Sequence, residues 1–150
     1  SKKFKNIFLS TGAAKISEIK KSLNFLKNNN VTVMHCVSSY PCTDENADLS
    51  RILKLKKISK SIGLSDHTND ILSSTLSLNL GITLIEKHFT IDNSLPGRDN
   101  KFAILPNKFL ELKNNIIRFN KMFKKRQEVF ISQEKEIRNI YTGRWSKSKI

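Results

Sequence analysis

The stretch "GLSDHT", residues Gly63 to Thr68, decides how the rest of this chain is interpreted. Strand-like apolar residues run into an acid and an imidazole, and a pattern of helical period begins directly afterwards. The stretch "LIEKHFT", Leu84 to Thr90, shows a similar arrangement further along the chain, with Glu86 and His88. Each stretch predicts a strand that carries a histidine at its carboxyl end.

The same alternation of strand and helix runs through most of the chain. Short apolar runs rich in β-branched residues alternate with longer segments of helical period. The pattern predicts strands over 6–11, 31–39, 61–65 and 82–90, and helices over 13–30, within 47–62, over 69–81 and over 106–126. No hairpin signal joins consecutive strands, so we expect an α/β fold with a parallel sheet.

Two architectures fit four such units, a doubly wound sheet and part of a (β/α)8 barrel. No G-x-G-x-x-G motif follows the first strand, which disfavours a dinucleotide-binding fold. A whole barrel takes about 200 residues or more, so four units make half of one. The chain starts almost directly on a strand and without Met, and we expect that an N-terminal half is missing. Residues 1–126 are then a partial barrel and residues 127–150 a linker.

Composition indicates a globular protein. Hydrophobic residues make up 38% of the 150 residues and charged residues 27%. No apolar run approaches the roughly 18 residues needed to cross a bilayer, and no secretory signal is visible. We therefore expect a cytoplasmic protein without a membrane partner. Two cysteines, Cys36 and Cys42, are too few for a disulfide framework, and we expect buried free thiols.

The formal net charge of +14 is compatible with nucleic acid, an anionic membrane surface or anionic small substrates as partners. The basic residues are mostly Lys and are scattered over predicted helix faces, without interleaved aromatics. A solvated surface accounts for this pattern, and we expect no nucleic-acid partner. A basic nucleic-acid-binding module is the alternative, and it predicts salt-dependent binding.

Two histidines occupy matching positions in this pattern. In parallel sheets and barrels the working residues lie at the carboxyl ends of strands, and there the sequence places His67 and His88. Neighbouring strands lie about 4.8 Å apart, so two imidazoles at adjacent strand ends can share one metal ion and leave other positions open. Two unrelated polar residues, one near a helix start and one buried, are the alternative.

Two acids accompany these histidines. Glu86 shares a strand face with His88, while Lys87 takes the other face, and an acid pointing into a barrel is unusual for a purely structural strand. Asp66 has two candidate roles: it orients an imidazole, or it caps the following helix together with Thr68.

The other strand ends are rich in hydroxyl groups. Ser10, Ser38 and Ser65 suit an oxyanion such as phosphate or carboxylate. Thr11 and Ser39 are better explained as ordinary turn residues. The loop over 93–101 carries Arg98 and Asp99, and it is either a polyol-binding loop or only a turn.

Five motifs in this order resemble the sialic acid synthase family, which includes N-acetylneuraminate synthase and relatives that make legionaminic and pseudaminic acids. They are "LSTG", "HCVSSYP", "GLSDHT", "EKHFT" and "LPGRDNKFA", and the resemblance covers about residues 4–145. It implies strands five to eight of a (β/α)8 TIM barrel. The segment "IYTGRWS" resembles the link into the family's small C-terminal antifreeze-like domain, so the resemblance implies that residues 127–150 hold a linker and the start of that domain. The family commonly forms homodimers.

The resemblance implies a transferase of carbohydrate biosynthesis. The family condenses phosphoenolpyruvate with an open-chain N-acylated amino sugar to a nine-carbon 2-keto acid and phosphate. The resemblance implies that His67 and His88 bind a divalent metal, usually Mn²⁺ with Mg²⁺ or Co²⁺ also used, and that Glu86 lies beside this metal. It implies that Ser10, Ser38 and Ser65 contact phosphoenolpyruvate. It also implies that Tyr40 and Asp99 line the site for the amino sugar.

The resemblance also implies what this chain lacks. The family's lysines for phosphoenolpyruvate lie on the first four strands, and an Arg comes from the antifreeze-like domain, so we expect the chain to be inactive alone. Two residues depart from the family near the sugar site: Arg98 stands where many members have Pro, and Cys42 where Pro or Thr is common. Another metal-dependent (β/α)8 aldolase or hydrolase is the second enzyme interpretation.

Overall fold

The computed structural model describes residues 3–143 of the chain. These residues form two compact units, one up to Phe119 and one from Asn120 onward. The first unit holds a four-stranded sheet, and the second holds a single helix after the end of α4. The elements are β1 (Asn6–Ser10), α1 (Ile16–Phe25), β2 (Asn30–Cys36), η1 (Asp44–Asn46), α2 (Arg51–Lys56), β3 (Ile62–Asp66), α3 (Leu72–Leu78), β4 (Leu84–Lys87), η2 (Asn100–Phe102), α4 (Pro106–Met122) and α5 (Ser132–Tyr141).

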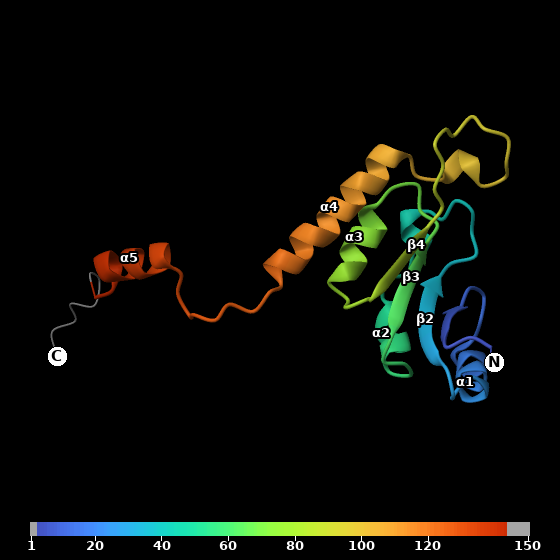
Figure 1. Ribbon diagram of the computed structural model, residues 1–150, viewed down its shortest axis with the longest axis horizontal. Helices are drawn as coiled ribbons and strands as arrows, with labels where there is room; N and C mark the ends of the chain where they lie inside the picture. The colour runs from blue at the N-terminus through green and yellow to red at the C-terminus, as the bar shows by residue number, and fades with distance from the viewer. Residues whose placement is uncertain (1–2, 144–150) are drawn as a thin grey trace. The chain divides into compact units, whose positions relative to one another are not determined.

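The four strands lie side by side in chain order, β1-β2-β3-β4, and every pair is parallel (Figure 1). The predicted parallel sheet is therefore confirmed. Each connection joins neighbouring strands, and the order does not reverse, whereas a doubly wound sheet reverses at a switch point. The strand order is that of a segment of a (β/α)8 barrel.

The helices cover one face of this sheet. A buried apolar cluster joins Ile19 of α1 and Ile52 of α2 to Val33 and Ile62 of the sheet. A second cluster packs Leu112 of α4 near Ile71 and Ile104, with Ile85 of β4 against it. Burial of each such side chain stabilises the fold by about 1.5–3 kcal/mol.

The opposite face carries no helix in the part of the chain that the structure describes. Side chains alternate along a strand, so residues next to the clustered ones point the other way. Register pairs Cys36 with Ser65 and Ser65 with Glu86, which places these three side chains in one row on that inner face. Helices on one face and polar groups on the other are what half of a barrel requires, so the predicted partial barrel is supported.

Met34 fills the next row of the inner face. Ser10 pairs with Met34, and Met34 with Gly63, one row below Ser65. A Cβ atom on Gly63 would lie 2.4 Å from the Met34 sulfur, so glycine lets this fully buried side chain keep its position. The Met34 side chain therefore lies beneath the row of Cys36, Ser65 and Glu86 on the inner face.

Several elements are shorter than the sequence predicted. The helix expected within 47–62 is limited to Arg51–Lys56, because Asp48 has a positive φ of 40° that a helix does not accept. The strand expected over 82–90 is limited to Leu84–Lys87, so His88 lies one residue beyond its end. All five residues of β3 are buried.

The second unit contains more helix than expected. The sequence predicted a linker over residues 127–150, but ten of these residues form α5. Glu134 accepts a hydrogen bond from the Ile131 N–H at 2.9 Å and pairs with Arg126 at 3.0 Å. The hydrogen bond from the Ile131 N–H satisfies a backbone donor at the start of this helix. Trp145 and the rest of 144–150 lie outside the described residues, and the start of an antifreeze-like domain stays a prediction.

A membrane span is not found within residues 3–143: none of the helices combines the length and the apolar character that a bilayer requires. Both cysteines are buried and unpaired, as predicted.

His35 is a buried histidine outside the polar face. It is fully buried on the helix-covered side, and its Nε2 lies 2.8 Å from the Ala47 carbonyl oxygen. Nδ1 has no hydrogen-bond partner among the described residues. Burial lowers the pKa of His35, opposed by the hydrogen bond to Ala47 and by Asp48, and assisted by Arg51.

We predict that His35 makes the chain less stable in mild acid. The unfolded chain takes up a proton near pH 6.5, which the folded chain resists, so the free energy of unfolding falls as pH drops below that value, with a slope of up to about 1.4 kcal/mol per pH unit. Urea unfolding between pH 7.5 and pH 5 measures it.

The matched control is His35→Gln, whose amide still donates a hydrogen bond to the Ala47 carbonyl but does not titrate. The other two histidines are present in both proteins, so they cancel in the difference. Equal slopes for the two proteins would contradict the assignment to His35.

Candidate active site

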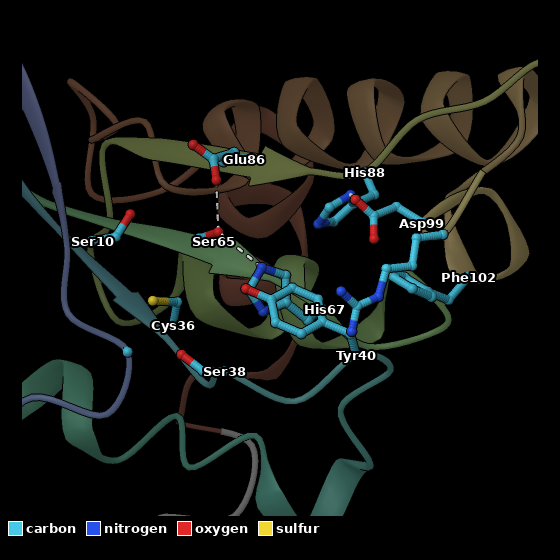
Figure 2. Close-up of a pocket in the computed structure, with 12 residues that line it drawn as sticks. Ser10, Cys36, Ser38, Tyr40, Ser65, His67, Glu86, His88, Asp99 and Phe102 are labelled. Atoms are coloured by element: carbon cyan, nitrogen blue, oxygen red, sulfur yellow. Dashed lines mark hydrogen bonds and ion pairs between the residues drawn. The ribbon is translucent and has the colours of Figure 1, made fainter.

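A cavity of about 650 Å³ opens at the carboxyl ends of the four strands (Figure 2). All eight residues that the sequence singled out for substrate or metal line it: Ser10, Ser38, Tyr40, Ser65, His67, Glu86, His88 and Asp99. The structure thus brings the predicted set together, while the role of each residue stays a prediction. Gly12, Cys36, Arg98 and Phe102 complete the lining.

The two histidines lie next to each other in this cavity. Their ring centroids are 5.4 Å apart, and both rings are on the inner side of the sheet (Figure 2). The predicted convergence therefore occurs. His67 is the residue after β3 and His88 the residue after β4, so the two strands bring both histidines to the same end of the sheet.

Each imidazole has an acceptor on its Nδ1 side. The Val37 carbonyl lies 2.7 Å from Nδ1 of His67, so we assign the ring proton to that nitrogen, and Nε2 then presents a lone pair. On His88, Nδ1 lies 3.7 Å from the Asp99 carboxylate. Metal-binding histidines are typically oriented in this way, with the second nitrogen facing a carbonyl or carboxylate.

Ser65 links one histidine to Glu86. Its hydroxyl donates a hydrogen bond of 2.7 Å to Oε1 of Glu86, and its oxygen lies 3.3 Å from Nε2 of His67 (Figure 2). With the proton of Ser65 directed at Glu86 and the ring proton directed at Val37, the Ser65 oxygen and Nε2 turn lone pairs towards each other. A cation near Nε2 would stabilise this arrangement.

The donor set fits a divalent metal only in part. Among residues 3–143, no three His, Cys, Asp or Glu residues lie close enough together to hold an ion. His67 and His88 offer two nitrogens, so water and substrate would complete the coordination. Such an incomplete site suits catalysis rather than structure.

An aromatic wall borders the histidines. The ring of Tyr40 lies 4.2 Å from that of His67, and the ring of Phe102 lies 5.2 Å from that of His88 in an edge-to-face arrangement. Tyr40 and Phe102 are themselves 6.0 Å apart. These contacts restrain both imidazole planes and leave an apolar side on the cavity.

The cavity has hydroxyl groups on its opposite side. Within the described residues, neither the hydroxyl of Ser10 nor that of Ser38 makes a hydrogen bond to protein, so both hydroxyls are available to a ligand. A Cβ atom on Gly12 would clash with Oγ of Ser38 and lie 3.1 Å from the Cys36 sulfur. Glycine at this position therefore lets the turn after β1 approach the Ser38 hydroxyl.

The two departures near the predicted sugar site have different positions. Arg98 lines the cavity and is the single Lys or Arg among its described lining residues. Cys42 is buried and lies behind the cavity, where its N–H donates to the His67 carbonyl at 2.8 Å. Of these two residues, only Arg98 can contact a ligand in the cavity.

Asp66 neither contacts the His67 ring directly nor caps α3. Its carboxylate does not touch the His67 ring, whose Nδ1 is held by Val37, and α3 begins only after Ile71. It lies on the helix-covered side and pairs with Lys87 at 3.1 Å. Burial lowers the pKa of Lys87, and the charge of Asp66 opposes that shift.

Thr11 and Ser39 have the structural roles expected of them. Thr11 donates to the Met34 carbonyl at 2.8 Å, and Ser39 to the Pro41 carbonyl at 3.0 Å. Three lining residues were missed from the sequence, namely Gly12, Cys36 and Phe102. Cys36 had a usable signal, because it precedes Ser38 by two residues on the same strand face.

Comparison with known proteins identifies relatives of this chain. It is 40% identical over 108 residues to an N,N'-diacetyllegionaminic acid synthase of Campylobacter jejuni, covering 68% of this chain and 32% of that protein. It is 38% identical over 104 residues to a pseudaminic acid synthase of Helicobacter pylori, covering 67% of this chain and 31% of that protein.

A solved structure shares the fold. The N-acetylneuraminic acid (sialic acid) synthetase of Leptospira borgpetersenii, crystallised in complex with citrate, superposes with a TM-score of 0.78 at 33% sequence identity. The match covers 92% of this chain and 50% of that one. This chain thus spans about a third of the two synthases above and half of the solved protein. Residues 1–128 match the NeuB family, and the chain belongs to that family of sialic-acid-synthase-like proteins.

Proposed function

We propose that this chain supplies half of the active site of a sialic-acid-type synthase. The reaction is the condensation of phosphoenolpyruvate with an open-chain N-acylated amino sugar. The observation that carries the proposal is the convergence of His67, His88 and the Ser65–Glu86 pair in one cavity of a NeuB-family chain. The relatives are named as synthases of this class of nine-carbon acid.

Nε2 of His67 and a nitrogen of His88 would hold a divalent ion, with Mn²⁺ as the first candidate and Mg²⁺ or Co²⁺ as substitutes. When bound, such an ion supplies a Lewis acid for the sugar aldehyde. The carbonyl of Val37 orients the His67 ring for this task. The carboxylate of Asp99 lies 3.7 Å from Nδ1 of His88.

The remaining groups position the two substrates. Ser10 and Ser38 offer free hydroxyls to the phosphate or carboxylate of phosphoenolpyruvate. Tyr40 and Asp99 border the space for the sugar, and Arg98 adds a positive charge there. Holding two reactants in a fixed geometry is itself a large part of the rate enhancement.

The reaction balances as follows. The methylene carbon of phosphoenolpyruvate forms a bond to the aldehyde carbon, and the aldehyde oxygen takes up a proton. The adjacent carbon becomes electron-deficient, and water adds to it and loses a proton. The carboxylate of Glu86 is in the cavity and can accept that proton. The tetrahedral intermediate then expels phosphate by cleavage of its C–O bond, which leaves the 2-keto acid.

The activity belongs to a larger assembly than this chain. The chain matches about a third of its synthase relatives. We therefore propose that positively charged residues from outside this chain also bind phosphoenolpyruvate, in addition to Arg98. A homodimer is also part of the proposal. A chimera tests it: residues 1–126 replace the matching segment of the Campylobacter jejuni synthase.

We predict that the chimera releases phosphate only when phosphoenolpyruvate, an N-acylated amino sugar and a divalent metal are all present. His67→Ala and His88→Ala should each lower this rate by about 100-fold or more, because each removes a metal ligand. His35→Gln is the matched control, since His35 lies outside the cavity, and it should retain activity. Product analysis distinguishes an aldolase or a hydrolase, and full activity in His67→Ala would refute the proposal.

A second prediction concerns Gly12→Ala in the same chimera. The new methyl group would displace the Ser38 hydroxyl, so we expect the KM for phosphoenolpyruvate to rise by about 10-fold, the loss of one good hydrogen bond. The KM for the sugar should change much less. Ser39→Ala removes a neighbouring hydroxyl that bonds only locally to Pro41, and it should leave both constants unchanged. An unchanged phosphoenolpyruvate KM in Gly12→Ala would contradict the assignment of Ser38.

A further inference from the structure

We infer that the buried ion pair between Asp66 and Lys87 is a strut that sets the separation of the two active-site histidines. The inference rests on the proposed function, because it concerns the same metal site. It assigns a positioning role to two residues that do not face the cavity, and that role has three structural supports.

The first support is position. Asp66 and Lys87 are register partners and the last residues of β3 and β4. Each directly precedes one histidine, His67 or His88. Because side chains alternate along the chain, the acid and the lysine point to the helix-covered side while the histidines point into the cavity. The ion pair and the histidine pair therefore lie back to back on the same two segments.

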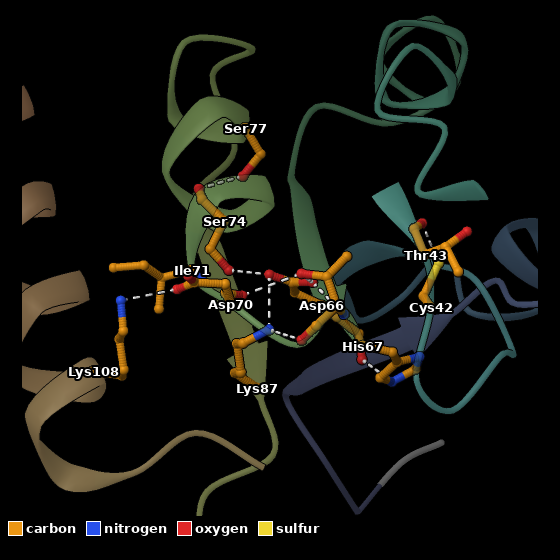
Figure 3. A network of polar contacts seen from close by, with 12 residues as sticks. Cys42, Thr43, Asp66, His67, Asp70, Ile71, Ser74, Ser77, Lys87 and Lys108 are labelled. Carbon is orange, nitrogen blue, oxygen red and sulfur yellow. Dashed lines mark hydrogen bonds and ion pairs between the residues drawn. The ribbon is translucent and has the colours of Figure 1, made fainter. Parts of the chain in front are cut away.

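The second support is the number of bonds at the pair (Figure 3). Nζ of Lys87 lies 3.1 Å from Oδ2 of Asp66 and donates to the Thr68 carbonyl at 2.6 Å. Oδ1 of Asp66 accepts from the N–H of Thr68 at 2.9 Å and from its hydroxyl at 2.7 Å, and Oδ2 accepts from the Ser74 hydroxyl at 2.6 Å. The two side chains are 1% and 4% exposed. Both charges are thus compensated by hydrogen bonds and by each other, and these bonds fix the orientation of both side chains.

The third support is that the sheet no longer joins the histidine segments. The β3–β4 ladder ends at Asp66 and Lys87. Beyond it, Thr68 forms a bridge with Cys42, and Phe89 with Ile104, so the two segments turn to different neighbours. The contacts of Lys87 with Asp66 and with the Thr68 carbonyl continue to connect them.

A role in stability alone explains this pair less well. A buried ion pair stabilises a fold little compared with apolar side chains of similar size, because both charges lose their hydration. A strut instead requires a fixed distance between two groups, which charged, fully bonded side chains provide and apolar ones do not. Altering its length should then change the metal site even where the fold persists.

The test measures cobalt binding to the full 150-residue chain, with the visible absorption of Co²⁺ as readout. His67→Ala should abolish the protein-bound spectrum. Lys87→Arg keeps the buried charge but changes its length and shape. We expect it to shift the cobalt spectrum and to weaken Co²⁺ binding by about 10-fold, as for other groups that orient metal ligands. Lys87→Met and Asp66→Asn should weaken binding at least as much.

Two controls separate positioning from stability. Lys108→Met breaks the exposed ion pairs with Asp70 and Glu111 and should leave the cobalt spectrum unchanged. Urea unfolding, followed by circular dichroism, reports the stability of each variant. If Lys87→Met or Asp66→Asn fails to fold, Lys87→Arg decides the question.

The outcomes distinguish the two hypotheses. Loss of the cobalt spectrum in His67→Ala together with a shifted spectrum in folded Lys87→Arg supports the strut. Loss in His67→Ala with a wild-type spectrum and affinity in Lys87→Arg overturns the strut and leaves the proposed metal site intact. Undiminished Co²⁺ binding in His67→Ala overturns both.

Discussion

The cavity depends on the register of the parallel ladder that joins β2, β3 and β4. Cys36 pairs with Ser65, and Ser65 with Glu86, so their side chains lie in one row on the inner face. The histidines follow two residues after Ser65 and Glu86 and therefore face the same way. A slip of one residue in β3 would turn His67 towards the helices and bring Asp66 into the cavity.

The outer face of the sheet opposes such a slip. Leu64 and Ile62 are buried beneath the helices, and a shift by one residue would place polar side chains in the apolar clusters. The cost of burying an unpaired polar group is comparable to the gain from several apolar contacts. The helix-covered face thereby fixes the orientation of the reactive face, although the two share no side chain.

The two faces of the sheet differ in the side chains that they carry. The inner face holds hydroxyls, imidazoles and a carboxylate in a cavity of about 650 Å³, and no helix of the described residues covers it. The outer face holds the apolar clusters and the compensated Asp66–Lys87 pair. The chain matches about a third of two synthase relatives. Arg98 is the single Lys or Arg among the described residues that line the cavity.

The family resemblance implied that Tyr40 and Asp99 belong to the site. The sequence by itself determined the four strand–helix units, their parallel pairing and six of the twelve described residues that line the cavity, namely Ser10, Ser38, Ser65, His67, Glu86 and His88. These features follow from local periodicity and from the rule that reactive residues gather at strand ends. Only the tertiary structure decided which sheet faces the helices cover, and so favoured a barrel segment over a doubly wound sheet. It also decided that Asp66 pairs with Lys87, that Val37 orients His67, and that Gly12 approaches Ser38. These contacts join residues far apart in the chain, and their partners depend on packing that no local pattern records.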